Sequence, residues 1–198
     1  MSATSAPRGL KPIGLLGGMP FAGSTREYLI KSGYSTAIFN GDVVGLADTA
    51  NSTDDGFIVR EAVASEVNPI GVFLGVSYTD PSTGQLTFKQ YYPGSIAASD
   101  IKAVVSVNPF TLYEVQADDA IAQTQLGMTA DLVQTAAGNT ITGNSGVQLD
   151  ASTASVGGEM FKIIDFVDRV GSTIGDAKTD VIVMMNQTEH AFLADVIT

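Results

Sequence analysis

Residues 69–95 carry the pattern that most constrains how this chain can fold. Apolar side chains recur at every second position over residues 72–79 and again over residues 86–89, which is the period of a β-strand. Between the two segments, Pro81 fixes φ for a turn, and Gly84 can adopt the positive φ at its end. The pattern predicts a β-hairpin and therefore a β protein.

The register of this hairpin is predicted from the positions of its apolar side chains. If Thr79 lies opposite Gln85 across the turn, the apolar side chains of both strands fall on one face. Because successive side chains of a strand point to opposite faces, we expect this face to be the interior of the protein. The side chains expected there are Val72, Leu74, Val76, Tyr78, Leu86 and Phe88.

The rest of the chain shows similar short apolar segments separated by turn residues. About ten strands are expected in one domain over residues 25–198. They include residues 35–39, 43–46, 101–107, 111–117, 128–134, 147–150, 159–169 and 179–186, and residues 57–64 are either a further short strand or an irregular segment. Residues 101–107 and 179–186 are apolar on both faces and should be central, whereas residues 24–33 and 118–127 favour short helical turns. The predicted fold class is all-β, a compact barrel or sandwich with one or two helical turns and an extended N-terminal arm.

Residues 1–24 are expected to form that arm. Pro7, Pro12 and Pro20 oppose both a helix and a central strand, and five glycines add flexibility. Apolar side chains on an irregular segment need a surface to cover them, which is either the protein's own domain or a neighbouring molecule. The apolar side chains concerned are Leu10, Ile13, Leu15, Leu16, Met19 and Phe21, and we take them as a candidate partner interface.

The charge balance limits the partners. Ten Lys and Arg against 21 Asp and Glu give a net charge of −11, which opposes binding to nucleic acid and to anionic membranes. Charged residues are only 16% of the chain, which suits permanent assembly but is equally typical of a Gly-rich β protein. Without Cys, disulfides and thiolate metal sites are excluded. No signal-peptide pattern or bilayer-length apolar segment is present, so we expect the protein to fold in the cytoplasm of the producing cell.

Catalytic and metal-binding patterns are weak. His190 is the only histidine, and its position after a predicted central strand favours a polar residue at a strand end. Ser145 lies between glycines, but Val147 breaks the nucleophile motif, so a β-turn is the expected structure. Residues 51–56 resemble the start of a calcium loop, but Ala62 stands where a bidentate Glu is needed. We therefore predict no enzyme activity, no cofactor and no metal.

Tyr91 and Tyr92 are adjacent, so on a strand they point to opposite faces. An outward tyrosine near the end of an apolar hairpin is a plausible interface anchor, because it offers a large area at low entropy cost. A tyrosine that caps the end of the barrel is the competing interpretation. Both residues join the candidate interface.

Several stretches between residues 31 and 192 follow one another in a recognisable order. They are Lys31–Tyr34, Ile38–Val44, Pro69–Val76, Lys89–Gly94, Tyr113–Asp118, Ile121–Gly127, Thr142–Gly146, Leu149–Asp150, Phe161–Asp165 and Asn186–His190. In this order the chain resembles the capsid decoration, or cement, proteins of tailed bacteriophages, including those of cyanobacterial and marine phages. The resemblance leaves the arm uncovered.

This resemblance implies a non-enzymatic virion protein on the outer surface of the phage head. Such proteins sit at local threefold positions, usually as homotrimers, and stabilise the lattice of the major capsid protein. The expected partners are therefore the major capsid protein and further copies of this chain, with no nucleic acid and no membrane. The alternative is a receptor- or glycan-binding virion module, such as a fibre or spike domain, that would use Tyr91 or Tyr92.

Overall fold

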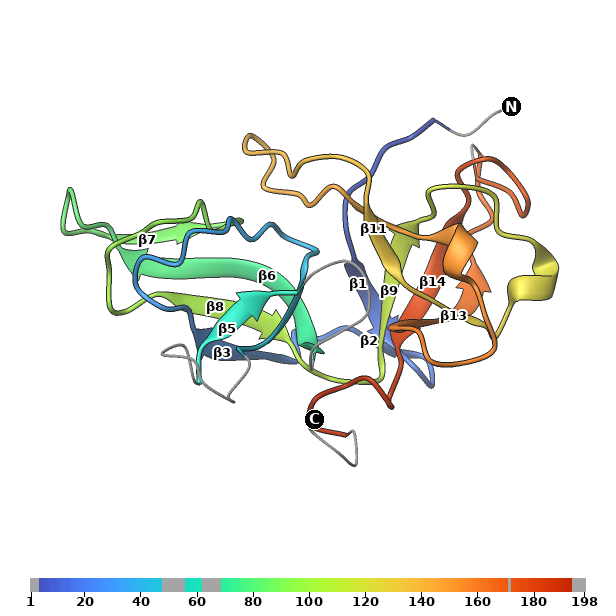
Figure 1. The fold of residues 1–198 in the computed structure, drawn as a ribbon, viewed down its shortest axis with the longest axis horizontal. Coiled ribbons are helices and arrows are strands. Elements are labelled where there is room, and N and C mark those ends of the chain that lie inside the picture. The colour runs from blue at the N-terminus through green and yellow to red at the C-terminus, as the bar shows by residue number, and fades with distance from the viewer. Residues whose placement is uncertain (1–3, 48–55, 62–68, 171, 194–198) are drawn as a thin grey trace.

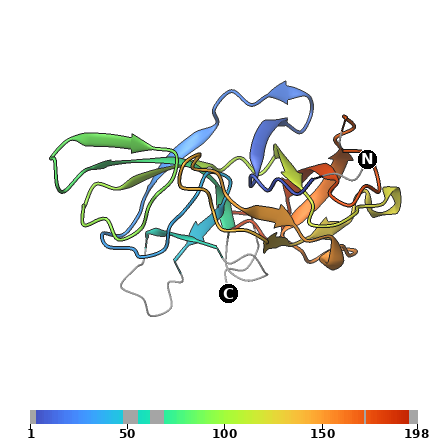
Figure 2. The ribbon, with the colours of Figure 1, turned by 90° about the horizontal axis from the view of Figure 1, so that it is seen from above.

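The computed structural model describes residues 4–47, 56–61, 69–170 and 172–193, and within them the protein is all-β. Fourteen strands and two single-turn 3₁₀ helices occur in these residues, and every strand ladder is antiparallel. Two six-stranded sheets lie side by side, each with its own hydrophobic core (Figures 1 and 2). Neither sheet closes on itself among the described residues, so the predicted all-β class is confirmed with open sheets in place of a barrel.

The first sheet contains both the first and the last strand of the described residues, β1 and β14. Its strands run β10-β13-β14-β9-β1-β2. Their bounds are β1 (Lys11–Leu15), β2 (Met19–Pro20), β9 (Thr111–Gln116), β10 (Thr129–Ala130), β13 (Phe161–Phe166) and β14 (Asp180–Met185). As its apolar sequence predicts, β14 is central, between β13 and β9. Val115, Phe161 and Val183 are fully buried in the core of this sheet.

The second sheet is organised around the long strand β6. Its order is β3-β8-β6-β4-β5, and β7 also pairs with β6. The bounds are β3 (Thr25–Leu29), β4 (Val43–Leu46), β5 (Ile58–Arg60), β6 (Pro69–Thr79), β7 (Leu86–Lys89) and β8 (Lys102–Ser106). β4 pairs with the first residues of β6, and β7 pairs with the last. β8 lies between β3 and β6, which confirms its predicted central position.

A short ladder and two helical turns complete the described structure. β11 (Leu132–Gln134) pairs with β12 (Val147–Leu149), and the turns are η1 (Gln123–Gln125) and η2 (Ala151–Thr153). η1 falls within the helical turn predicted at residues 118–127. The helical turn predicted at residues 24–33 is wrong, because Thr25–Leu29 forms the edge strand β3 along β8.

The predicted register of the central hairpin is wrong by one residue. Thr79 lies opposite Leu86, and the turn closes through the backbone N–H of Asp80, which donates to the carbonyl of Gln85 at 2.9 Å. The Asp80 carboxylate also accepts the N–H of Ser82 at 2.8 Å, which fixes a four-residue turn. A shift of one residue moves every side chain of β7 to the other face, so Leu86 and Phe88 point to solvent.

The expectation of one continuous apolar face on β6 also needs correction. The pairing of β6 with β8 contains a bulge between Phe73 and Gly75, which shifts the alternation by one residue. Val72 therefore packs into the core of the first sheet, whereas Val76 and Tyr78 pack into the core of the second. β6 thus connects the two cores.

The prolines do not keep the N-terminal segment out of the sheet. β1 lies between β9 and β2 and forms a hairpin with β2 through Gly17 and Gly18, both at positive φ. Pro12 is tolerated because the β1–β9 pairing is irregular immediately after it, and Pro20 because β2 is an edge strand. Part of the predicted arm is therefore a strand pair of the first sheet.

Candidate partner interface

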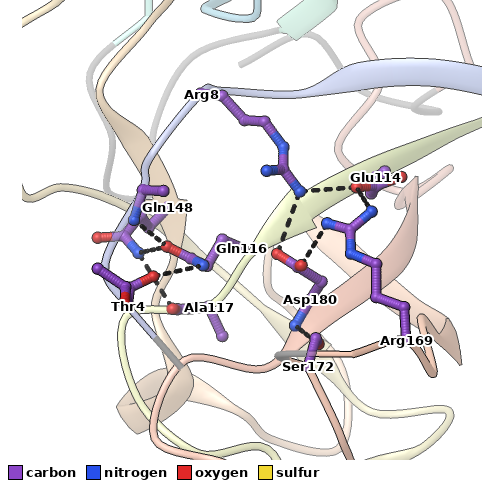
Figure 3. A network of polar contacts seen from close by, with 10 residues as sticks. Thr4, Arg8, Glu114, Gln116, Ala117, Gln148, Arg169, Ser172 and Asp180 are labelled. Atoms are coloured by element: carbon purple, nitrogen blue, oxygen red, sulfur yellow. Dashed lines mark hydrogen bonds and ion pairs between the residues drawn. The ribbon is translucent and has the colours of Figure 1, made fainter. Parts of the chain in front are cut away.

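The N-terminal segment reaches the first sheet through a buried amide network (Figure 3). Gln116 Oε1 accepts the backbone N–H of Ala6 at 2.7 Å, and its Nε2 donates to the carbonyl of Thr4 at 3.3 Å. Gln148 orients this amide, because its Nε2 donates both to Gln116 Oε1 at 3.2 Å and to the carbonyl of Ala117 at 3.1 Å. One side-chain amide therefore holds the backbone of residues 4–6 as a strand partner would.

Four charged side chains continue this attachment beside β1 (Figure 3). Arg8 Nη2 lies 2.7 Å from Glu114 Oε1 and 3.3 Å from Asp180 Oδ1. Arg169 contacts the same two carboxylates, at 2.9 Å and 2.5 Å. Two cations are thus balanced by two largely buried anions, and the chain entering β1 is held in one conformation.

The hairpin that follows presents an apolar surface to solvent. Ile13, Leu16 and Met19 are exposed, with Met19 60% accessible. Phe110 is exposed beside them, since its carbonyl accepts the N–H of Leu16 at 2.8 Å. We call these four residues the hairpin patch. Ile13 and Met19 stand on the strand pair, Leu16 lies in its turn, and the hydrogen bond from Leu16 ties Phe110 to it, so the patch is a preformed surface.

The six candidate interface residues of the N-terminal segment therefore divide into three groups. Ile13, Leu16 and Met19 are exposed, and Leu15 and Phe21 are half-buried. Leu10 is fully buried in the core of the first sheet, so a partner cannot reach it without opening the fold.

Tyr91 and Tyr92 lie beside the second sheet, and Tyr92 belongs to its hydrophobic core. Tyr92 is fully buried, and its hydroxyl donates to the carbonyl of Tyr34 at 2.8 Å. Tyr91 is half-buried and stacks on Phe39, with ring centroids 5.2 Å apart. Both rings are occupied by intramolecular packing, which favours the interpretation that these tyrosines are structural.

A second exposed apolar surface lies on the outer face of the second sheet, where the predicted register had placed core. Leu86 is 62% and Phe88 76% accessible, and both stand on β7. Beside Phe88, a groove of about 360 Å³ runs over the small residues Gly75 and Ser77 of β6 toward Val104 of β8. We call this surface the β7 face. Sequence reasoning missed it because a one-residue change of register exchanges the buried and exposed sides of a strand.

The two candidate catalytic side chains, Ser145 and His190, do not contact each other and form hydrogen bonds with other residues. Ser145 Oγ donates to Asp42 Oδ1 at 2.5 Å, and Asp42 is buried against the guanidinium of Arg60, whose Nε lies 2.9 Å away. His190 instead accepts the backbone N–H of Phe192 at Nδ1, at 3.2 Å. The two side chains are thus committed to different partners. Asn51 to Asp55 of the calcium-like stretch lie outside the described residues.

Two carboxyl groups are buried in surroundings that oppose their ionisation. Burial raises the pKa of Glu61 from 4.5 to about 8, and its Oε1 has no hydrogen-bond partner among the described residues. The pKa of Asp131 is raised to about 6, mainly by burial and to a smaller extent by the neighbouring carboxyl of Glu159. The backbone N–H of Met160 donates to Asp131 and acts in the opposite direction. These groups are candidates for pH-dependent stability.

Within the described residues, no group of three or more His, Asp or Glu side chains is placed to hold a metal ion. No helix in the described part of the chain is long and apolar enough to cross a membrane. Comparison with known proteins identifies no relative, because no family model, no curated protein and no solved structure matches the chain.

Proposed function

We propose that this protein is a non-enzymatic virion structural protein, a decoration or cement protein that binds the outer surface of a tailed-phage head. It would stabilise the lattice of the major capsid protein. The observation that carries the proposal is the hairpin patch, whose exposed apolar side chains lie on and beside a hairpin that is anchored into the sheet. The resemblance of residues 31–192 to phage cement proteins supplies the identity of the partner.

The hairpin patch suits a docking surface energetically. Burying a large apolar side chain contributes roughly 1.5–3 kcal/mol, so covering Leu16, Met19 and Phe110 would supply a few kcal/mol per copy. Because the hairpin is already ordered, little conformational entropy is lost on binding. A ligand that binds only the assembled shell stabilises it by mass action, and many copies make the effect large.

The β7 face supports the proposed self-association as a homotrimer. A threefold ring needs two different surfaces per subunit, one on each side of the contact. Leu86 and Phe88 would form one of these surfaces, leaving the hairpin patch for the capsid. The fibre or spike alternative relied on an outward Tyr91 or Tyr92, and the intramolecular packing of both rings gives it no support.

The experiment is to mix the purified protein with expanded capsids that lack it. We expect stoichiometric binding and a higher bursting temperature of the capsid. The double variant Leu16→Ser/Met19→Ser should bind at least about tenfold more weakly. Ile141→Ser, which changes an even more exposed apolar side chain on a loop, is the control and should bind like the parent protein. If the parent protein does not bind capsids, the proposal is wrong.

The oligomeric state provides a separate test. Sedimentation equilibrium of the parent protein should show a trimer, and Leu86→Ser/Phe88→Ser should shift it toward monomer. A trimer unaffected by this double change would place the subunit contact elsewhere. Wild-type capsid binding by a monomeric double variant would show that the two surfaces act independently.

A further inference from the structure

The outer edge of the first sheet at β10 is covered by residues 154–159, which we call the β10 loop. On one side β10 pairs with β13. On the other side Thr129 and Ser155 form an isolated antiparallel bridge, in which each backbone N–H donates to the other carbonyl, at 3.0 Å and 2.9 Å. The N–H of Gly157 also donates to Thr129 Oγ1 at 3.1 Å. The loop therefore occupies backbone groups that an edge strand otherwise leaves open.

Little apolar packing holds the β10 loop in place. Val156 is 93% accessible, and the two residues that follow it, Gly157 and Gly158, have no side chain to bury. The same three residues form one wall of a surface pocket of about 470 Å³, which also contacts Met128 and Thr129. A segment with few buried apolar contacts opens at a low cost in free energy. The polar contacts at the base of the loop therefore decide its position.

Two carboxyl groups meet at this base, those of Asp131 and Glu159, and we call them the carboxyl pair. Asp131 is only 6% accessible, and its Oδ1 accepts the N–H of Met160 at 3.1 Å. Glu159 belongs to the β10 loop, and its carboxyl lies within hydrogen-bonding reach of the Asp131 carboxyl. Glu159 Oε1 also accepts the hydroxyl of Ser155 at 3.2 Å, which links the pair to the bridge with β10. Two carboxyl groups form such a contact favourably only while they share a proton.

No cation among the described residues balances the carboxyl pair. Asp150, which precedes η2, also faces Asp131 and is itself acidic. Lys178 donates to the backbone carbonyl of Asp118, and Lys162 of β13 is exposed. Neither lysine forms an ion pair with the two carboxyls. The residues outside the described ranges contain no Lys, Arg or His, so they add no side-chain cation.

Loss of the shared proton therefore leaves two negative charges in contact at a largely buried position. Mainly because of burial, the pKa of Asp131 is raised from 3.8 to about 6, so this loss occurs near neutral pH. Asp131 itself is fixed, because its N–H donates to Thr153 Oγ1 at 2.9 Å and its carbonyl accepts the N–H of Asp150 at 2.9 Å. Glu159 is half-buried on the β10 loop, so it is the partner that can move into solvent.

We propose that the carboxyl pair of Asp131 and Glu159 is a proton-dependent latch that holds the β10 loop over the edge of the first sheet. The latch is closed while the pair shares a proton. When this proton is lost to water, Glu159 separates from Asp131 and the loop leaves Thr129, which exposes the backbone of β10 and removes one wall of the surface pocket. The latch does not depend on the proposed capsid binding.

Amide hydrogen exchange followed by NMR tests the latch, because the N–H groups of Thr129 and Ser155 both belong to the bridge that opens. Exchange is measured on the full chain at pH 5 and pH 7.5, and each rate is corrected for the intrinsic exchange rate of that amide. In the parent protein the protection of both amides should fall at least about tenfold between the two pH values. Protection that is the same at both pH values overturns the proposal.

Two variants, Glu159→Gln and Asp131→Asn, each remove one charge from the carboxyl pair. Either amide can donate to the carboxylate that remains, so the loop should stay closed and the protection should change by less than about threefold between the two pH values. Asp165→Asn, which removes an exposed acidic charge from β13, is the matched control and should keep the fall seen in the parent protein. A fall as large as the parent's in either variant of the pair overturns the proposal.

Discussion

The guanidinium of Arg8 contacts the carboxylate of Glu114 at 2.7 Å, across 106 positions of sequence. Because Arg169 contacts the same carboxylate, removal of Arg8 leaves Glu114 with one cation. We expect Arg8→Gln to lower the free energy of unfolding by about 1 kcal/mol in urea titrations, with a smaller loss at high salt. Lys11→Gln, which changes an exposed cation on β1, should cost less than about 0.5 kcal/mol. Equal effects of the two changes would show that the Arg8 contacts contribute nothing.

Leu10 and Leu16 test how the N-terminal segment is divided between core and surface. Leu10 is fully buried, so Leu10→Ala should cost about 2–5 kcal/mol of unfolding free energy. Leu16→Ala should cost about 0.5 kcal/mol or less, because Leu16 is exposed. For the same reason, deletion of residues 1–24 should unfold the free protein, since it removes β1 from the sheet. A deletion variant with the parent melting temperature would contradict this structure of the first sheet.

Gly71 is required by the close approach of β6 to β8. A Cβ at this position would lie 2.1 Å from the carbonyl oxygen of Ser106 and 2.9 Å from Cγ1 of Val105. Because backbone would have to shift, Gly71→Ala should cost at least about 2 kcal/mol. Gly75→Ala is the control on the same strand, since its closest contact would be 3.2 Å, and it should cost less. Unfolding titrations of the two variants would disagree with this structure if the order were reversed.

The raised pKa of Glu61 makes stability depend on pH in a defined direction. The folded state holds the proton up to about pH 8, whereas the unfolded carboxyl releases it near 4.5. The contribution is therefore fully present below pH 4.5 and is lost as pH rises through 8; Asp131 acts in the same direction near 6. Between about pH 5 and pH 8.5 we expect Glu61 to account for a loss of about 2–4 kcal/mol of unfolding free energy. Glu61→Gln, which cannot ionise, should flatten this part of the profile, and an unchanged slope would show that Glu61 is not the titrating group.

The sequence predicted the elements of this fold better than their registers. Apolar runs were sufficient to identify the central strands, because a strand buried on both faces cannot contain many polar residues. The same reasoning could not predict which face of β7 is exposed to solvent. It depends on whether Asp80 or Thr79 closes the turn, and the hydrogen bond from Ser82 to the Asp80 carboxylate decides this.

The candidate interface was predicted in part for a related reason. Exposed apolar residues on the β1–β2 hairpin were identifiable, since they are too apolar for a solvated tail. The pairing of β1 with β9 was not, because the irregularity that accommodates Pro12 is set by a partner about a hundred residues later. Long-range pairing of this kind leaves little signal in the local pattern.

Phe88 provides the sharpest test of the hairpin register. In the structure it is 76% accessible and lies opposite Ser77, whereas the neighbouring strand position Tyr78 is fully buried. Phe88→Ser should therefore change the unfolding free energy of the free subunit by no more than about 0.5 kcal/mol, while Tyr78→Ala should cost about 3–5 kcal/mol. The measurement is made at a dilution at which the subunit is monomeric, so that any contact of the β7 face with another copy does not contribute. Loss of more than about 2 kcal/mol in Phe88→Ser would return this ring to the core and restore the register in which Gln85 lies opposite Thr79.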